Sequence, residues 1–169
     1  MGNSATTIIA IILAAILMFV FPLMTMADKT DDTVKLTVQT ATTNFTNQVR
    51  NTGYLSQEDY DKFLLTLSST NNSYDVELVV QKLDENPAKK ASGVNVQIGD
   101  NVYYTMYTTQ VLESLPLSLK EGDIISVTVK NTNKTIANQL RNFMFRVTGN
   151  ESKAITAQSS GIITKTTTK

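Results

Sequence analysis

The feature that most constrains this chain is an uncharged apolar stretch near its N-terminus. Residues 6–27 read TTIIAIILAAILMFVFPLMTMA, which is 22 residues without a single charged side chain. As a helix this stretch would be about 33 Å long, and the hydrocarbon core of a bilayer is about 30 Å thick. Large apolar side chains recur on every side of such a helix, which is typical of lipid contact rather than of packing on a soluble core. We therefore predict a single membrane-spanning helix within residues 1–27.

Two interpretations of this segment stay open, a retained anchor and a signal segment that is removed after Ala27. Thr25 and Ala27 are small residues at the spacing of a cleavage site, and Pro22 would break the helix ahead of them. However, no Lys or Arg precedes the apolar run, and the run is long for the apolar core of a signal peptide. We prefer the anchor. Packing of this helix in the membrane is then expected to involve Ile8, Ile12, Ala15, Phe19 and Pro22.

Composition excludes several classes of function. The 15 basic residues balance the 15 acidic ones, whereas a nucleic-acid binder needs a basic surface to neutralise phosphates. The absence of Cys and His excludes a Ser-His-Asp triad, a thiol nucleophile, a disulfide, and a zinc site with thiolate or imidazole ligands. We therefore expect no enzyme activity, no cofactor and no nucleic-acid partner.

The side of the membrane on which the rest of the chain lies is predicted from its composition. Lys29 and Lys35 follow the apolar stretch and weakly favour a cytoplasmic C-terminal side. Long domains, however, cross the membrane largely regardless of such flanking charge. A chain with 25 Thr and 14 Asn but no Cys or His is typical of an exported bacterial protein. We predict a single-pass protein of the cell membrane with its C-terminal domain outside, at the cell surface, or secreted if the N-terminus is cleaved.

Residues 28–53 are predicted to form an amphipathic helical stalk that continues the membrane helix. A polar break lies at residues 28–32, and we expect the stalk and the membrane helix to form one long rod with residues 30–32 as the joint. The alternation of residues 33–37 also allows a strand there. Gly53 is a natural C-terminal cap for the helix. The spacing of one apolar face predicts an assembly surface, formed by Val34, Val38, Ala41, Phe45 and Val49.

Residues 54–163 are predicted to form an α+β head of three or four strands packed with helices. Ser56 should cap a helix that contains Tyr60 and Phe63, and a second amphipathic helix should begin near Ile136 and end at Gly149. Alternating apolar residues predict strands at 74–80, 124–130 and 154–163, with a short one at 94–98 inside a long loop. Residues 102–115 fit either a helix capped by Asp100 or a strand at their start, and residues 164–169 are expected to be a mobile polar tail.

Three clusters of acidic residues are the candidates for acid–base chemistry. The first of them, or Asp100 with Asn101, could contribute oxygen ligands to a metal. Each cluster has a structural explanation as the polar break, a helix N-terminus or a turn, and none lies in an indicated cleft or matches a calcium-binding loop. Tyr103, Tyr104 and Tyr107 could form a binding platform, but such spacing more often belongs to a core. We therefore predict neither catalytic nor metal-binding residues. The acidic clusters are Asp31/Asp32 (with Asp28 as a further metal candidate), Glu58/Asp59/Asp61 and Glu121/Asp123.

The chain combines an uncharged N-terminal helix containing a proline, an amphipathic continuation and a small α+β head. Short segments along most of the chain accompany this plan, namely 49–56, Tyr60, Phe63, 74–76, 121–123 and Gly161. With these features the chain resembles type IV pilin-like surface proteins. The nearer match is to TadE-like and related proteins of Gram-positive bacteria that are associated with pilus-like or conjugation machinery.

The sequence also departs from the pilin pattern. Pilins carry a basic leader that ends in Gly and a Glu at the fifth mature position, whereas here only Gly2 could end a leader and the first Glu is Glu58. The resemblance thus implies a minor pilin-like or accessory component of a pilus, secretion or conjugation apparatus rather than a major pilin. Its partners would be the lipid bilayer and other membrane or pilus-like subunits, contacted through the N-terminal helix. The alternative is an anchored or secreted binding domain, such as an adhesin or receptor.

Overall fold

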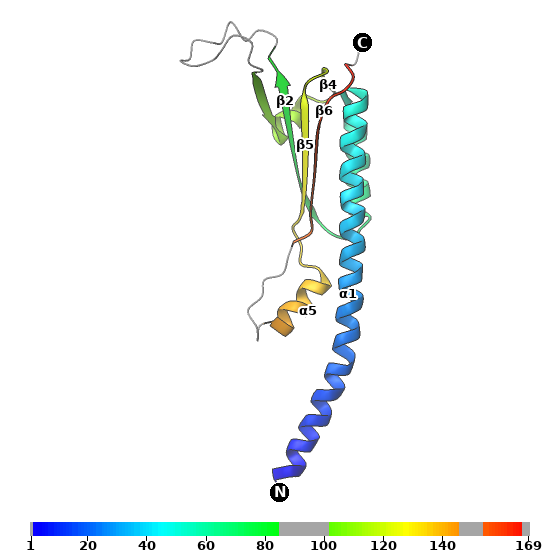
Figure 1. Cartoon of the computed structure of the whole chain (residues 1–169), viewed down its shortest axis with the longest axis vertical. Helices are drawn as coiled ribbons and strands as arrows, with labels where there is room; N and C mark the ends of the chain where they lie inside the picture. The colour runs from blue at the N-terminus through cyan, green and yellow to red at the C-terminus, as the bar shows by residue number, and fades with distance from the viewer. Residues whose placement is uncertain (1, 85–101, 146–153, 167–169) are drawn as a thin grey trace, which may run out of the picture.

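The computed structural model describes residues 2–84, 102–145 and 154–166 and has the predicted α+β architecture. Helix α1 (Gly2–Thr52) is a rod that extends the full length of the molecule (Figure 1). The small head is built beside the C-terminal half of this rod, and the N-terminal half projects from it. The predicted plan of a long N-terminal helix followed by a head of strands and helices is therefore confirmed.

Helix α1 runs without interruption through residues 30–32, which confirms the predicted single rod, and residues 33–37 are helical rather than a strand. Its many threonines are compatible with a helix because their hydroxyls donate to carbonyls one turn back. Thr30 donates to the Met26 carbonyl at 3.0 Å, and the buried Thr42 donates to the Val38 carbonyl at 2.7 Å. The helix ends at Gly53, whose φ of +64° suits a residue without a side chain and whose N–H donates to the Val49 carbonyl at 2.8 Å.

Helix α2 (Gln57–Ser68) confirms the predicted N-cap at Ser56. The Ser56 hydroxyl oxygen accepts from the Asp59 backbone N–H at 3.1 Å. The Ser56 hydroxyl also donates to the Asp59 carboxylate at 2.5 Å, so two hydrogen bonds join Ser56 to Asp59 across the first turn. The apolar side of α2 is buried through Tyr60, Phe63 and Leu67.

The head contains two antiparallel sheets. The larger has the order β3-β2-β5-β6, and the smaller pairs β1 with β4. In the larger sheet Ile125 lies between Val80 on β2 and Gly161 on β6, which places these three residues on one face. The strands are β1 (Tyr54–Leu55), β2 (Tyr74–Leu83), β3 (Tyr103–Tyr107), β4 (Leu117–Ser118), β5 (Ile124–Asn131) and β6 (Thr156–Ile162).

The hydrophobic core lies between one face of the larger sheet and the two helices α1 and α2. On the sheet side, Leu78, Val80 and Val127 are completely buried. The opposite face, with Ser126, Thr128 and neighbouring polar residues, is not part of this core. One face packed and one face polar is the usual arrangement of an antiparallel sheet.

Residues 102–115, for which the sequence left a helix or an initial strand open, begin with a strand. Strand β3 forms first and the short helix α4 (Thr108–Glu113) follows directly, so the alternative with a strand at the start of the segment is confirmed. Residues 103–107 form a strand because they pair with β2, with Met106 opposite Val80. Tyr103 and Tyr104 consequently point to opposite faces, and the tyrosines do not form one platform.

Helix α5 (Ile136–Phe145) confirms the second amphipathic helix. The predicted helix end at Gly149 and the short strand at 94–98 lie outside the described residues. The tail expected to be mobile is bonded to α1 and to the head within its described part. The Thr164 N–H donates to the Arg50 carbonyl at 3.1 Å, and the Thr166 hydroxyl accepts from the Glu121 N–H at 2.9 Å.

Candidate functional site

The N-terminal half of α1 is the most conspicuous surface of the molecule. Within the described residues, α1 is the one helix that is long and apolar enough to cross a membrane, and none of its most apolar stretch is buried in the protein. Phe19 is 71% exposed and Met18 75% exposed, although water-soluble proteins rarely leave such large apolar patches uncovered. The helix is therefore compatible with a membrane anchor or with a signal sequence.

The residues predicted to pack in the membrane all lie on this exposed segment. Ile8, Ile12 and Phe19 are each more than half exposed, and Ala15 and Pro22 are also exposed. Pro22 lies inside the helix, which is curved in its N-terminal half in Figure 1. A proline has no N–H to donate one turn back, so it weakens the helix at this position without ending it.

The C-terminal half of α1 is joined to its own head by the face that the sequence predicted as an assembly surface. Val38, Phe45 and Val49 are buried in the core, and Val34 and Ala41 pack against its margin. The predicted helical face is thus confirmed, but its role in the described structure is intramolecular. Val38 and Val49 have no exposed surface with which to contact another subunit.

An aromatic cluster joins α1 to α2 within this core. The rings of Phe45 and Phe63 stack with centroids 4.5 Å apart, and Tyr60 lies tilted against Phe45 at 6.4 Å. Burial, together with the nearby carboxylates of Asp61 and Asp75, raises the pKa of the Tyr60 hydroxyl. The pKa rises because burial and negative neighbours both disfavour the phenolate.

The first charged residues after the apolar stretch hold α5 against α1. Asp28 forms an ion pair with Arg141, with 2.5 Å between carboxylate and guanidinium and about a third of each side chain exposed. The Thr135 hydroxyl donates to the Asp31 carboxylate at 2.7 Å and also accepts from the Asn138 backbone N–H. These contacts join positions more than 100 residues apart in the chain, and they attach the head to α1 next to residue 27.

The other two acidic clusters have structural partners. Asp59 accepts from the hydroxyl of the N-cap residue Ser56 and also from the Gln48 side chain at 2.7 Å, and so links α2 to α1. Asp123 is 3% exposed, and its two carboxylate oxygens accept from the backbone N–H groups of Leu83 and Lys120, each at 2.9 Å. Both residues thus act as fixed hydrogen-bond acceptors. The described residues contain no group of three side chains suited to hold a metal ion.

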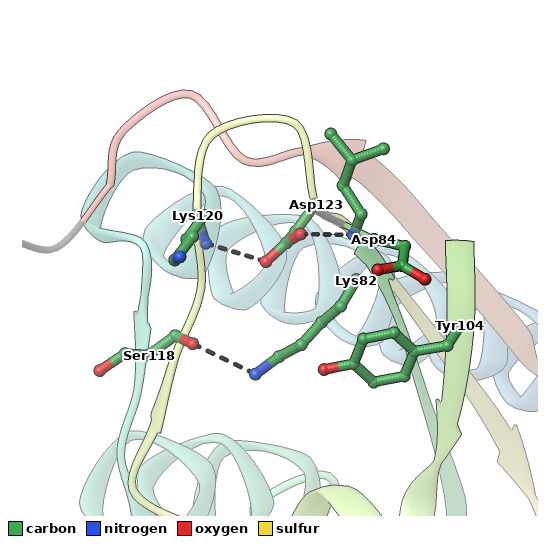
Figure 2. Close-up of a pocket in the computed structure, with 7 residues that line it drawn as sticks. Lys82, Asp84, Tyr104, Ser118, Lys120 and Asp123 are labelled. Atoms are coloured by element: carbon green, nitrogen blue, oxygen red, sulfur yellow. Dashed lines mark hydrogen bonds between the residues drawn. The ribbon is translucent and has the colours of Figure 1, made fainter. Parts of the chain in front are cut away.

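A shallow hollow of about 310 Å³ lies beside Asp123 at the end of the head. Figure 2 shows the side chains of Lys82 and Tyr104 pointing into the same space, with Lys82 donating to the Ser118 carbonyl at 3.4 Å. Asp123 forms part of the wall, but its oxygens are already bonded to the backbone. The geometry accounts for Asp123 as the residue that holds the loop before β5 against the end of β2.

No known protein-family model, curated protein or solved structure matches this chain. What can be concluded about function therefore comes from α1, from the head that it carries, and from the contacts between them.

Some contacts that position the head were not predicted from the sequence. Arg50 lies across Gly161 on β6, where an added Cβ would be 2.4 Å from the Arg50 Cδ, and its Nε donates to the Ile162 carbonyl at 3.0 Å. A glycine inside a strand is a signal for such a close approach. The ion pair between Asp28 and Arg141 has no such signal, because nothing local links the two positions.

Proposed function

We propose that this chain is a membrane-anchored structural subunit whose head stands outside the membrane. We further propose that it serves as a minor pilin-like or accessory component of a pilus, secretion or conjugation apparatus. The observation that carries the proposal is that one unbroken helix has two different surroundings: α1 is buried by the head along its C-terminal half and bare along its apolar N-terminal half.

The length of α1 supports an anchoring role. At 1.5 Å per residue its 51 residues extend about 77 Å, of which a bilayer core takes up about 30 Å. The remainder is the part that carries the head. Because no loop separates the two parts, the position of the apolar segment fixes the position of the head.

The bare helix also supports an assembly role. The head does not cover the apolar half of α1, so this half can contact either lipid or neighbouring helices. The exchange is possible because both environments are apolar and because the helix satisfies its backbone hydrogen bonds internally. The head contributes a polar outer face on β5 and β6, which includes Ser126, Thr128 and Gln158. Such a face suits contact in water rather than burial in a further core.

Cysteine cross-linking tests the proposal cleanly because the chain has no native Cys. Ile12→Cys lies on the predicted packing side of the apolar helix, and Leu17→Cys, five residues later, lies on the opposite side. In membranes of the native host we expect Ile12→Cys to form disulfide-linked products with another subunit and Leu17→Cys to form far fewer. Equal, random cross-linking at both positions, or none, would contradict an assembly role.

Two further measurements separate this proposal from an anchored or secreted binding domain. Electron microscopy of filaments from cells with and without the protein should show a change in their number or composition. Thr128→Cys in the head should react with a membrane-impermeant maleimide on intact cells. Unchanged filaments together with a labelled, membrane-bound head would favour the binding domain, and an unlabelled head would contradict the predicted orientation.

A further inference from the structure

Helix α5 has an apolar side that the head does not cover. Ile136 is 72% exposed, and Leu140, one turn later, is only half-buried. The sequence continues the same spacing with Phe143 and Met144. A helix with an uncovered apolar side needs a partner or an apolar surface.

The side of α5 that contacts α1 is a different one. Ala137 and Asn138 are buried, and Arg141 reaches Asp28 on α1. Successive helical residues are about 100° apart, so Ile136 and Ala137 face different directions. The contact with α1 therefore leaves the Ile136 side of α5 uncovered.

The height of α5 along α1 is fixed by two contacts, one with Asp28 and one with Asp31. The uncharged stretch ends at residue 27. The headgroup layer on each side of a bilayer is about 5–8 Å thick, which corresponds to about four or five residues of a helix that starts where the hydrocarbon ends. If residues 6–27 span the hydrocarbon, both contacts lie within the headgroup layer.

The place of α5 in the molecule agrees with this position. Figure 1 shows α5 below the end of the sheet, at the end of the head nearest the N-terminal half of α1; it begins beside α1 and runs downward and away from it. Lys29 on α1 and Lys134 just before α5 are exposed at the same level, where ammonium groups can reach lipid phosphates.

We propose that α5 is an interfacial helix that lies on the bilayer surface, with its Ile136 side in the boundary between headgroups and acyl chains. This proposal rests on the membrane anchor proposed above. We name lipid as the partner because α5 is attached to α1 directly after the apolar segment ends. The uncovered side of α5 and the apolar segment of α1 therefore lie next to each other along α1, and both need an apolar environment. The ion pair between Asp28 and Arg141 then fixes how deeply the head sits, and α5 keeps the head from tilting about α1.

Single-cysteine labelling of the full chain in vesicles of phosphatidylcholine and phosphatidylglycerol tests this proposal. An environment-sensitive fluorophore is placed at Ile136→Cys on the apolar side of α5. The matched control is Asn142→Cys, an exposed position on α5 about 120° around the helix from Ile136. A third label at Met18→Cys reports on the membrane span. All three positions are exposed, so the substitutions leave the core of the head unchanged.

Quenching by lipids that are spin-labelled near the headgroup is compared with quenching by aqueous iodide. We expect the Ile136 label to be quenched several-fold more by lipid than the Asn142 label, and the reverse for iodide. The Met18 label should resist iodide and be quenched by lipids that are spin-labelled deep in the acyl chain.

Each other outcome overturns a different statement. A lipid-quenched Met18 label with an iodide-accessible Ile136 label would overturn the interfacial helix and leave the anchor intact. An Ile136 label that is shielded from both quenchers would show that protein, not lipid, covers α5. A Met18 label that is accessible to iodide and not quenched by lipid would overturn the anchor itself.

Discussion

Replacing Phe45 with alanine should loosen the head from α1 more than any change on the outer surface of that helix. Phe45 is 4% exposed and stacks on Phe63 with nearly parallel ring planes, 7° apart. Truncating a buried Phe typically costs about 3–5 kcal/mol, of which about 0.5–1.5 kcal/mol belongs to the aromatic pair itself. A domain of ordinary stability has about 5–15 kcal/mol in total, so the loss is a substantial share.

Thermal unfolding of the full chain in detergent micelles, followed by near-ultraviolet circular dichroism, measures this effect. For a chain of this size each kcal/mol shifts the Tm by about 2–4 °C, so Phe45→Ala should lower the Tm by on the order of 10 °C. Leu36→Ala is the control, because Leu36 lies on the same helix but is 66% exposed, and it should cost no more than about 0.5 kcal/mol.

A double substitution isolates the contact between the two rings. If stacking contributes as the geometry indicates, Phe45→Ala and Phe63→Ala should be non-additive by about 0.5–1.5 kcal/mol. A Tm for Phe45→Ala equal to that of Leu36→Ala would refute the assignment of this side of α1 to the core of the head.

Three further substitutions test other contacts. Because folding raises the pKa of Tyr60, the folded state favours the neutral phenol, and the unfolding free energy should fall as pH rises through and above about 10. Tyr60→Phe should flatten that fall in a series of unfolding measurements at increasing pH, and an unchanged slope would disprove the link. Asp123→Ala removes the acceptor of two backbone N–H groups and should lower the free energy of unfolding by on the order of 3 kcal/mol in denaturant unfolding. Glu121→Ala, at an exposed position, should lower it by almost nothing. Equal losses for the two variants would contradict the role of Asp123 as a buried hydrogen-bond acceptor. Gly161→Ala should cost about 1–3 kcal/mol because its Cβ would displace Arg50, and the cost should largely vanish in an Arg50→Ala background. If Gly161→Ala costs as much in the Arg50→Ala background, the loss of stability does not come from the clash with Arg50.

Local patterns in the sequence were sufficient for the elements with a strong period or cap. The serine–aspartate cap of α2, the glycine that ends α1 and the alternating residues of β2 and β5 each depend on neighbours within a few positions. The long apolar N-terminal helix was predictable for the same reason, since length and lack of charge are local properties.

Features that depend on distant segments were not predictable. Whether residues 103–107 form a strand or a helix is decided by pairing with β2, because the aromatic and β-branched residues suit both. The packing of Val38 and Val49 on their own head rather than on another subunit also depends on where the sheet folds back. The same holds for the ion pair between Asp28 and Arg141, which fixes the height of α5.

The mass of the mature protein, taken from both the membrane fraction and the medium of its native host, tests the central claim most directly. A retained anchor predicts a membrane-bound chain that still contains residues 6–27, either intact or shortened only as far as Gly2. A protein recovered from the medium that begins at Asp28 would contradict the anchor, because the head would then have lost the apolar helix that holds it at the membrane.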